Sequence, residues 1–164
     1  MSGAAPLAQG SLSVGPIALE GSYLDATLQP SSGALPQQDL VDGTVFLSAK
    51  PSEFVQLKGG IHARSYVTPG GTERWVFWEA RAHGEVPLGP GVRAYVEAWR
   101  ALGTESVALP LNQAQGGEAG LKAITLHNRV RVRLSYAIDD AQAGGGVSRQ
   151  TVETFLLAIG LRLP

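Results

Sequence analysis

The fold is decided by residues 121–138, which read LKAITLHNRVRVRLSYAI. Large apolar side chains fall on the even positions: Ile124, Leu126, Val130, Val132, Leu134, Tyr136 and Ile138. Arginines occupy the odd positions 129, 131 and 133. Because successive side chains of a β-strand point to opposite faces of a sheet, this alternation predicts a strand. We expect its apolar face to pack on the core and its arginines to face solvent.

The C-terminal segment has the same period. Large apolar side chains recur at every second position: Phe155, Leu157, Ile159, Leu161 and Leu163. A helix capped by Ser148 is an alternative. The period of two fits better, so we predict a second strand here.

A hairpin is predicted between these strands and the N-terminus. Residues 61–68 and 73–79 are joined by Pro-Gly-Gly-Thr at 69–72, and proline and glycine suit the second and third positions of a type II turn. On the second arm, Trp75, Phe77 and Glu79 share one face. The opposite face carries Arg74, Val76 and Trp78. Aromatic side chains on both faces indicate that neither face is fully hydrated.

Residues 91–102 fit two structures. Apolar residues at 92, 95, 96, 99 and 102 have the spacing of an amphipathic helix. Residues 92, 94, 96 and 98 also alternate as in a strand. The sequence leaves a short helix and a strand both open.

The remaining sequence is typical of an all-β chain. Its 21 glycines and 10 prolines interrupt the 164 residues at short intervals, and no linker separates two domains. We predict an antiparallel β-sandwich, like a jelly roll, of about eight or nine strands. Residues 1–10 form an N-terminal arm in this interpretation, and residues 11–164 form a single sandwich domain.

The composition points to a surface that meets other molecules. Only 16% of residues are charged, against about 25% in average globular proteins, and the net charge is −1. There is no cysteine, which excludes disulfides and thiolate sites. The N-terminus lacks the pattern of a signal peptide, and no apolar run approaches the roughly 20 residues of a membrane helix. We therefore expect no membrane span.

No catalytic or cofactor signature is present. His83 and Glu85 fall on one strand face, but the histidines at 62, 83 and 127 lack metal-ligand spacing. Asp139 and Asp140 lack the alternating acidic pattern of a calcium loop. Residues 116–122, GGEAGLK, lack the ending of a phosphate loop. We expect no catalytic, cofactor-binding or metal-binding residues, no cofactor, and no enzymatic activity.

Two groups are candidate interface residues. Arg129, Arg131 and Arg133 form a ladder on one strand face, which most simply pairs with carboxylates on a neighbouring strand. A salt bridge between subunits and a nucleic-acid face are the alternatives, in that order. Trp75, Trp78 and Trp99 are core candidates, and any that reach the surface would anchor an interface or stack on a sugar.

The arm MSGAAPLAQG, the hairpin IHARSYVTPGGTERWVFWE and the strand NRVRVRLSYAI together give a plan that resembles the single jelly-roll coat and decoration proteins of viruses. This resemblance implies a non-catalytic shell protein that forms homo-oligomers and touches neighbouring structural proteins, located in the virion, or otherwise in the cytoplasm. A β-sandwich module that binds carbohydrate or another small molecule is the alternative, and a nucleic-acid-binding β protein is the third. Nucleic acid is not expected as a partner.

Overall fold

The protein is all-β. The computed structural model describes residues 6–28, 38–68, 71–106, 111–125, 130–143 and 148–161. These residues form strands and short turns, and among them no helix is long and apolar enough to cross a membrane.

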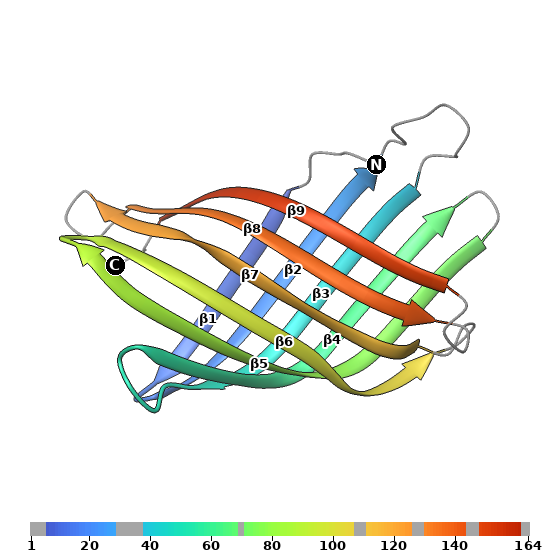
Figure 1. Cartoon of the computed structure of the whole chain (residues 1–164), viewed down its shortest axis with the longest axis horizontal. Coiled ribbons are helices and arrows are strands. Elements are labelled where there is room, and N and C mark those ends of the chain that lie inside the picture. The colour runs from blue at the N-terminus through green and yellow to red at the C-terminus, as the bar shows by residue number, and fades with distance from the viewer. Residues whose placement is uncertain are drawn as a thin grey trace.

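Nine strands follow one another along the described chain (Figure 1). Their bounds are β1 Leu7–Val14, β2 Ile17–Leu28, β3 Gln38–Ala49, β4 Val55–Thr68, β5 Gly71–Gly89, β6 Val92–Ser106, β7 Leu111–Thr125, β8 Val130–Ala143 and β9 Ser148–Leu161. Each strand pairs antiparallel with the next, so the strand order in the sheet is the order in the sequence. The register therefore shows one sheet. The all-β class and the strand number are confirmed, whereas a two-sheet sandwich or jelly roll is not shown.

Tight turns close one end of the sheet. Val14 pairs with Ile17 across a turn in which Gly15 has φ 60°, and Gly91 has φ 74° in the turn before β6. Glycine takes these left-handed conformations without the steric penalty of a Cβ atom. We call this the turn end, and the opposite end, where β2 leads into β3, the loop end.

The structure settles the open choices. Residues 92–106 form β6, so the alternating pattern prevails over the helical one. The C-terminal segment is β9, as predicted, and β4 and β5 form the predicted hairpin, in which Thr68 pairs with Gly71. Residues 7–10 of the predicted arm belong to β1. Residues 1–5 lie outside the described part of the chain.

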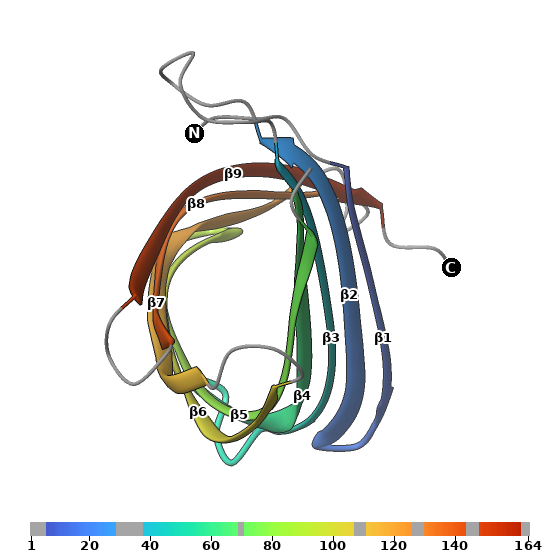
Figure 2. The same cartoon turned by 90° about the vertical axis from the view of Figure 1, so that its right-hand side faces the viewer.

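The sheet curls, so that β7 lies opposite β2–β4 (Figure 2). Buried and exposed side chains alternate along the strands. The buried set faces the inner, concave side, because Arg64, a buried residue of β4, meets Asp139 of β8 across the curl. A small apolar cluster lies on this inner face, towards the loop end: Ala26, Leu40, Trp75, Phe77, Trp99 and Ala114. Most other buried side chains are polar or charged, including His62, Glu79, His83 and Glu97.

The predicted orientation of β8 is wrong. Leu134, Tyr136 and Ile138 are exposed on the outer face, whereas Arg133 points inwards and is paired. The prediction assumed that the larger apolar set must be the buried one. In this sheet, polar side chains that pair with one another occupy much of the inner face, and the apolar set of β8 is left outside.

Candidate functional site

The inner face carries a continuous network of ionisable side chains, and His62 on β4 lies in its middle. His62 Nδ1 is 2.7 Å from Glu79 Oε2, and His62 Nε2 is 2.8 Å from Asp42 Oδ2. Both histidine and glutamate are almost completely buried. The three residues occupy neighbouring strands β3, β4 and β5, and the antiparallel register brings their inward positions together.

Charge is balanced around this histidine. Burial alone would lower the pKa of His62, but hydrogen bonds to Asp42 and Glu79 outweigh it and raise the pKa above the ordinary value. Burial would raise the pKa of Asp42, but hydrogen bonding to His62 and the charge of Arg64 hold it well below its usual range. The imidazolium therefore donates from both ring nitrogens to two carboxylates.

Arg64 joins this centre to the opposite wall of the sheet. Its Nε donates to Asp42 Oδ2 at 2.7 Å, and its Nη2 donates to Asp139 Oδ2 on β8 at 2.9 Å. The indole of Trp99 on β6 donates to the other oxygen of Asp139 at 2.9 Å. The cross-sheet ion pair thus ties β4 to β8 and places charged groups across the interior.

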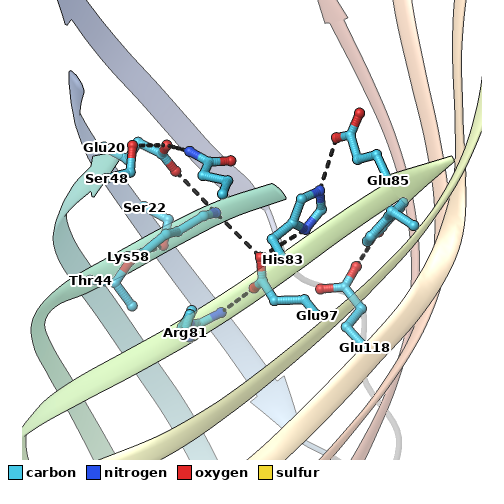
Figure 3. A network of polar contacts seen from close by, with 12 residues as sticks. Glu20, Ser22, Thr44, Ser48, Lys58, Arg81, His83, Glu85, Glu97 and Glu118 are labelled. Atoms are coloured by element: carbon cyan, nitrogen blue, oxygen red, sulfur yellow. Dashed lines mark hydrogen bonds and ion pairs between the residues drawn. The ribbon is translucent and has the colours of Figure 1, made fainter. Parts of the chain in front are cut away.

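A second group, drawn in Figure 3, is joined to the first through the contact of Arg81 with Glu79. Arg81 contacts both Glu79 and Glu97, the latter at 2.9 Å. Lys58 lies 3.1 Å from Glu20 and 3.3 Å from Glu97, so it links β2 to β6 across the inner face. Burial would raise the pKa of Glu97, but the hydrogen bond to His83 and the charges of Lys58 and Arg81 hold it well below its usual range.

The network continues towards the turn end. His83 Nδ1 lies 3.1 Å from Glu97 and its Nε2 lies 2.9 Å from Glu85, as the shared face of His83 and Glu85 predicts. Lys122 contacts Glu85 at 2.5 Å. Burial would raise the pKa of Glu85, but hydrogen bonds to Lys122 and His83 and their charges lower it to about 2.

A third group of polar side chains lies on the inner face of β6–β8. Tyr95 donates a hydrogen bond to Glu118, which also pairs with Arg133. Burial and the bond to Glu118 raise the pKa of Tyr95 to about 12. Arg133 is therefore held within the protein by a carboxylate on the adjacent strand, which was the simplest interpretation of the arginine ladder.

The outer face differs from the inner face in its lack of charged side chains. It contains a band of outward positions free of Asp, Glu, Lys and Arg, which we call the uncharged band. These positions are the odd residues of 17–23, 41–49, 55–67, 117–123 and 155–159, and the even residues of 76–88, 92–98 and 130–138. The large apolar side chains in the band are mostly exposed, and Trp78 is 60% exposed. Outward charges begin only beyond it, towards the loop end, at Asp25, Asp39, Arg74, Arg100, Asp140 and Glu153.

The uncharged band runs obliquely to the strands. A row of paired residues that starts at Ile17 on β2 passes through Leu57 and Ile138 and reaches Glu153 on β9. On β2, Ile17 is the residue of the uncharged band that lies nearest the turn end. On β9, Glu153 already lies past the band on its loop-end side. On β2, Asp25 lies eight residues beyond Ile17, and on β9, Glu153 lies eight residues from Leu161, where the strand ends. The band therefore shifts by about eight residues over seven strand steps.

The tryptophans predicted as interface anchors separate. Trp75 and Trp99 lie on the inner face and are buried in the apolar cluster, whereas Trp78 lies on the outer face. Of the arginine ladder, Arg133 is paired, Arg131 occupies an exposed inward position, and Arg129 lies outside the described residues. The predicted interface residues that the structure describes thus lie on both faces of the sheet.

The other sequence candidates take structural roles. Asp139 binds Arg64 and Trp99, and Asp140 accepts a hydrogen bond from Thr151 at 3.3 Å. Residues 116–122 lie within strand β7. Within the described ranges, no group of three or more His, Asp or Glu side chains is arranged to hold a metal ion. His127 lies outside those ranges.

Sequence reasoning missed the inner network as a unit. A signal was available: the charged residues of β2–β6 at 20, 42, 58, 79, 81 and 97 fall on the same parity as the buried positions of their own strands. Only the register shows that they meet, because the partners come from strands up to 75 residues apart, as in the pair of Arg64 and Asp139.

Comparison with known proteins finds no matching family model, no matching curated protein and no matching solved structure.

Proposed function

We propose that this chain is a non-catalytic structural protein whose sheet is embedded in a lipid bilayer, with the uncharged band against the acyl chains. The observation that carries the proposal is the band itself. On β2–β9, outward positions lack charge over stretches of about five to thirteen residues, while most ionisable side chains of the same stretches point inwards. Water-soluble sheets have the opposite arrangement, with the apolar face inside.

The dimensions of the band fit a bilayer. A shift of eight residues over seven strand steps, at roughly 3.3 Å per residue and 4.8 Å between strands, corresponds to strands tilted by about 38°. Sheets that cross membranes tilt by about 35–45°. At this tilt, a stretch of nine residues such as 41–49 spans roughly 23 Å, close to the apolar height of about 25 Å in such sheets.

The interior supports the same conclusion. Charges in a low-dielectric setting must be paired, and the inner face pairs Arg64, Arg81 and Arg133 each with a carboxylate. The ion pair of Arg64 with Asp139 crosses the interior, and the apolar cluster lies on the inner face towards the loop end. Paired charges and packed apolar side chains thus line the enclosed face, which supports a structural element. The lack of a long apolar run concerns membrane-spanning helices, whereas this proposal concerns strands.

Trp78 provides the test, because it is the one tryptophan on the outer face, whereas Trp75 and Trp99 are buried inside. The purified protein is refolded into vesicles whose acyl chains carry bromine, a contact quencher of indole fluorescence. We expect strong quenching in the wild type and little in Trp78→Phe, whose remaining tryptophans are shielded. This comparison leaves the core unchanged.

Equal, weak quenching in both proteins would overturn the proposal. If the protein instead forms particles in lipid-free solution, with Trp78 insensitive to brominated lipid, the uncharged band is covered by further copies of the chain. In that case copies of the chain, and not acyl chains, cover the uncharged band, which is the self-assembly that the sequence predicts. Light scattering of the same sample distinguishes the two.

A further inference from the structure

The two end strands of the sheet have free edges. Pairing within the described chain runs from β1 through β9 without a link between these two strands. One side of β1 and one side of β9 therefore present backbone N–H and C=O groups to whatever surrounds them.

Neither edge is protected against pairing. Strand β1, LAQGSLSV, carries no charge and no proline, and β9 carries no charge from residue 154 to 161. Exposed edges in water are usually blocked by lysine, proline or bulges. Val14 at 86%, Leu12 at 77% and Phe155 at 74% are also the three most exposed large apolar side chains of the described residues. All three belong to these end strands, which points to a missing neighbour there.

We propose that β1 and β9 of the same chain pair with each other in the membrane and complete the sheet. The inference rests on the proposed function, because hydrocarbon offers no water to satisfy a free edge. The curl favours the chain's own edge as the partner, since the sheet already encloses its own ion pairs, including that of Arg64 on β4 with Asp139 on β8.

The strand number fixes the direction of this pairing. Neighbouring strands alternate in direction, so the first and the ninth run the same way. The closing pair is therefore parallel, unlike the other eight. The register follows from the turn end, which Val14 and Leu161 both reach. Leu12 and Ile159 each lie two residues before the turn-end residue of their own strand, Val14 and Leu161. Both occupy outward positions, so this register places Leu12 beside Ile159.

The absence of cysteine makes this testable without removing native thiols. The variant Leu12→Cys with Ile159→Cys is oxidised in vesicles and examined on a non-reducing gel and by intact mass. Adjacent strands place Cα atoms about 5 Å apart, within the range of a disulfide. The positive control is Leu12→Cys with Leu19→Cys, a pair already opposite each other in β1 and β2. The negative control is Tyr23→Cys with Ile159→Cys.

We expect the test pair to form a disulfide within one chain to an extent similar to the positive control. A register shifted by one pair of residues would move the cross-link to Leu157→Cys and would retain the closure. Cross-linked dimers in place of monomers would overturn it in favour of pairing between copies, and no cross-link at either position would overturn it altogether. Because Trp78 quenching is measured separately, a closure that fails in a lipid-embedded protein is distinguishable from a protein that never enters lipid.

Discussion

Replacing Glu79 by alanine should strongly destabilise the protein. Glu79 is 0% exposed, accepts a hydrogen bond from His62 at 2.7 Å and pairs with Arg81. Its removal leaves a buried imidazolium and a buried guanidinium each short of one carboxylate. Breaking a buried ion pair from one side costs about 3–5 kcal/mol. The folding equilibrium constant should therefore fall by roughly a hundredfold to a few thousandfold.

The assay is chemical unfolding of the protein in detergent micelles, followed by tryptophan fluorescence. Trp99 reports on the site because its ring lies 6.1 Å from that of His62. Glu153→Ala is the matched control, because Glu153 accepts a hydrogen bond from Tyr136 at 2.8 Å on the exposed outer face. Such a surface contact should contribute less than about 0.5 kcal/mol.

Glu79→Gln separates charge from shape, since it retains an acceptor oxygen but no negative charge. We expect its free energy of unfolding to lie between those of the wild type and Glu79→Ala. In a double-mutant cycle with His62→Ala, the coupling energy should fall in the range of about 0.5–3 kcal/mol. If Glu79→Ala unfolds within about 1 kcal/mol of the wild type, as the control does, the inner network does not hold the sheet together.

Three further predictions concern pH, packing and the uncharged band. The free energy of unfolding should be greatest between about pH 4.5 and 6.5. The pKa of Glu85 is lowered to about 2, so its contribution is lost as pH falls through that value, whereas the pKa of His62 is raised, so its contribution is lost as pH rises through that pKa. A pH series of unfolding curves with no such maximum would contradict this. Gly60→Ala should destabilise the sheet by about 1–3 kcal/mol, because a Cβ atom there would overlap backbone and side-chain atoms of Phe46 at 2.8 Å, whereas Gly59→Ala, with nothing within 4 Å, should be tolerated; equal melting temperatures for the two variants would refute the packing argument. Val96→Arg, in the uncharged band, should reduce the stability of the protein in a bilayer by about 2–4 kcal/mol and lower the fraction that floats with vesicles. Asp25→Arg, beyond the band, should float like the wild type. Flotation of both variants at the wild-type level would argue against lipid contact.

Local structure was accessible from the sequence because it depends on local pattern. The alternation in 130–138 and 155–161 predicted β8 and β9, and Pro-Gly at 69–70 predicted the β4–β5 hairpin. The segment at 91–102 was undecided, because its apolar spacing satisfies both periods. Pairing with β5 and β7 decides in favour of a strand, since it satisfies the backbone of residues 92–100 on both edges.

The candidate site was less accessible. His83 and Glu85 were placed together correctly because they are two positions apart on one strand. The partners of His62 come from β3 and β5, and no property of the sequence near residue 62 indicates them. The parity of β5 predicted that Trp75 and Trp78 face opposite sides, but only the curl of the sheet shows that the face of Trp75 is the buried one.

The amino-acid sequence alone determined that this chain has strands with two chemically different faces, because a period of two is a property of each strand by itself. It did not determine which face would be enclosed. That choice was made by the tertiary structure, in which eight consecutive antiparallel pairings curl the sheet and bring charges of opposite sign, such as Arg64 and Asp139, within hydrogen-bond distance. Once those charges neutralise one another inside, the apolar side chains are left for the outer face, and the alternation of β8 has the opposite meaning from the one it has in a water-soluble sheet.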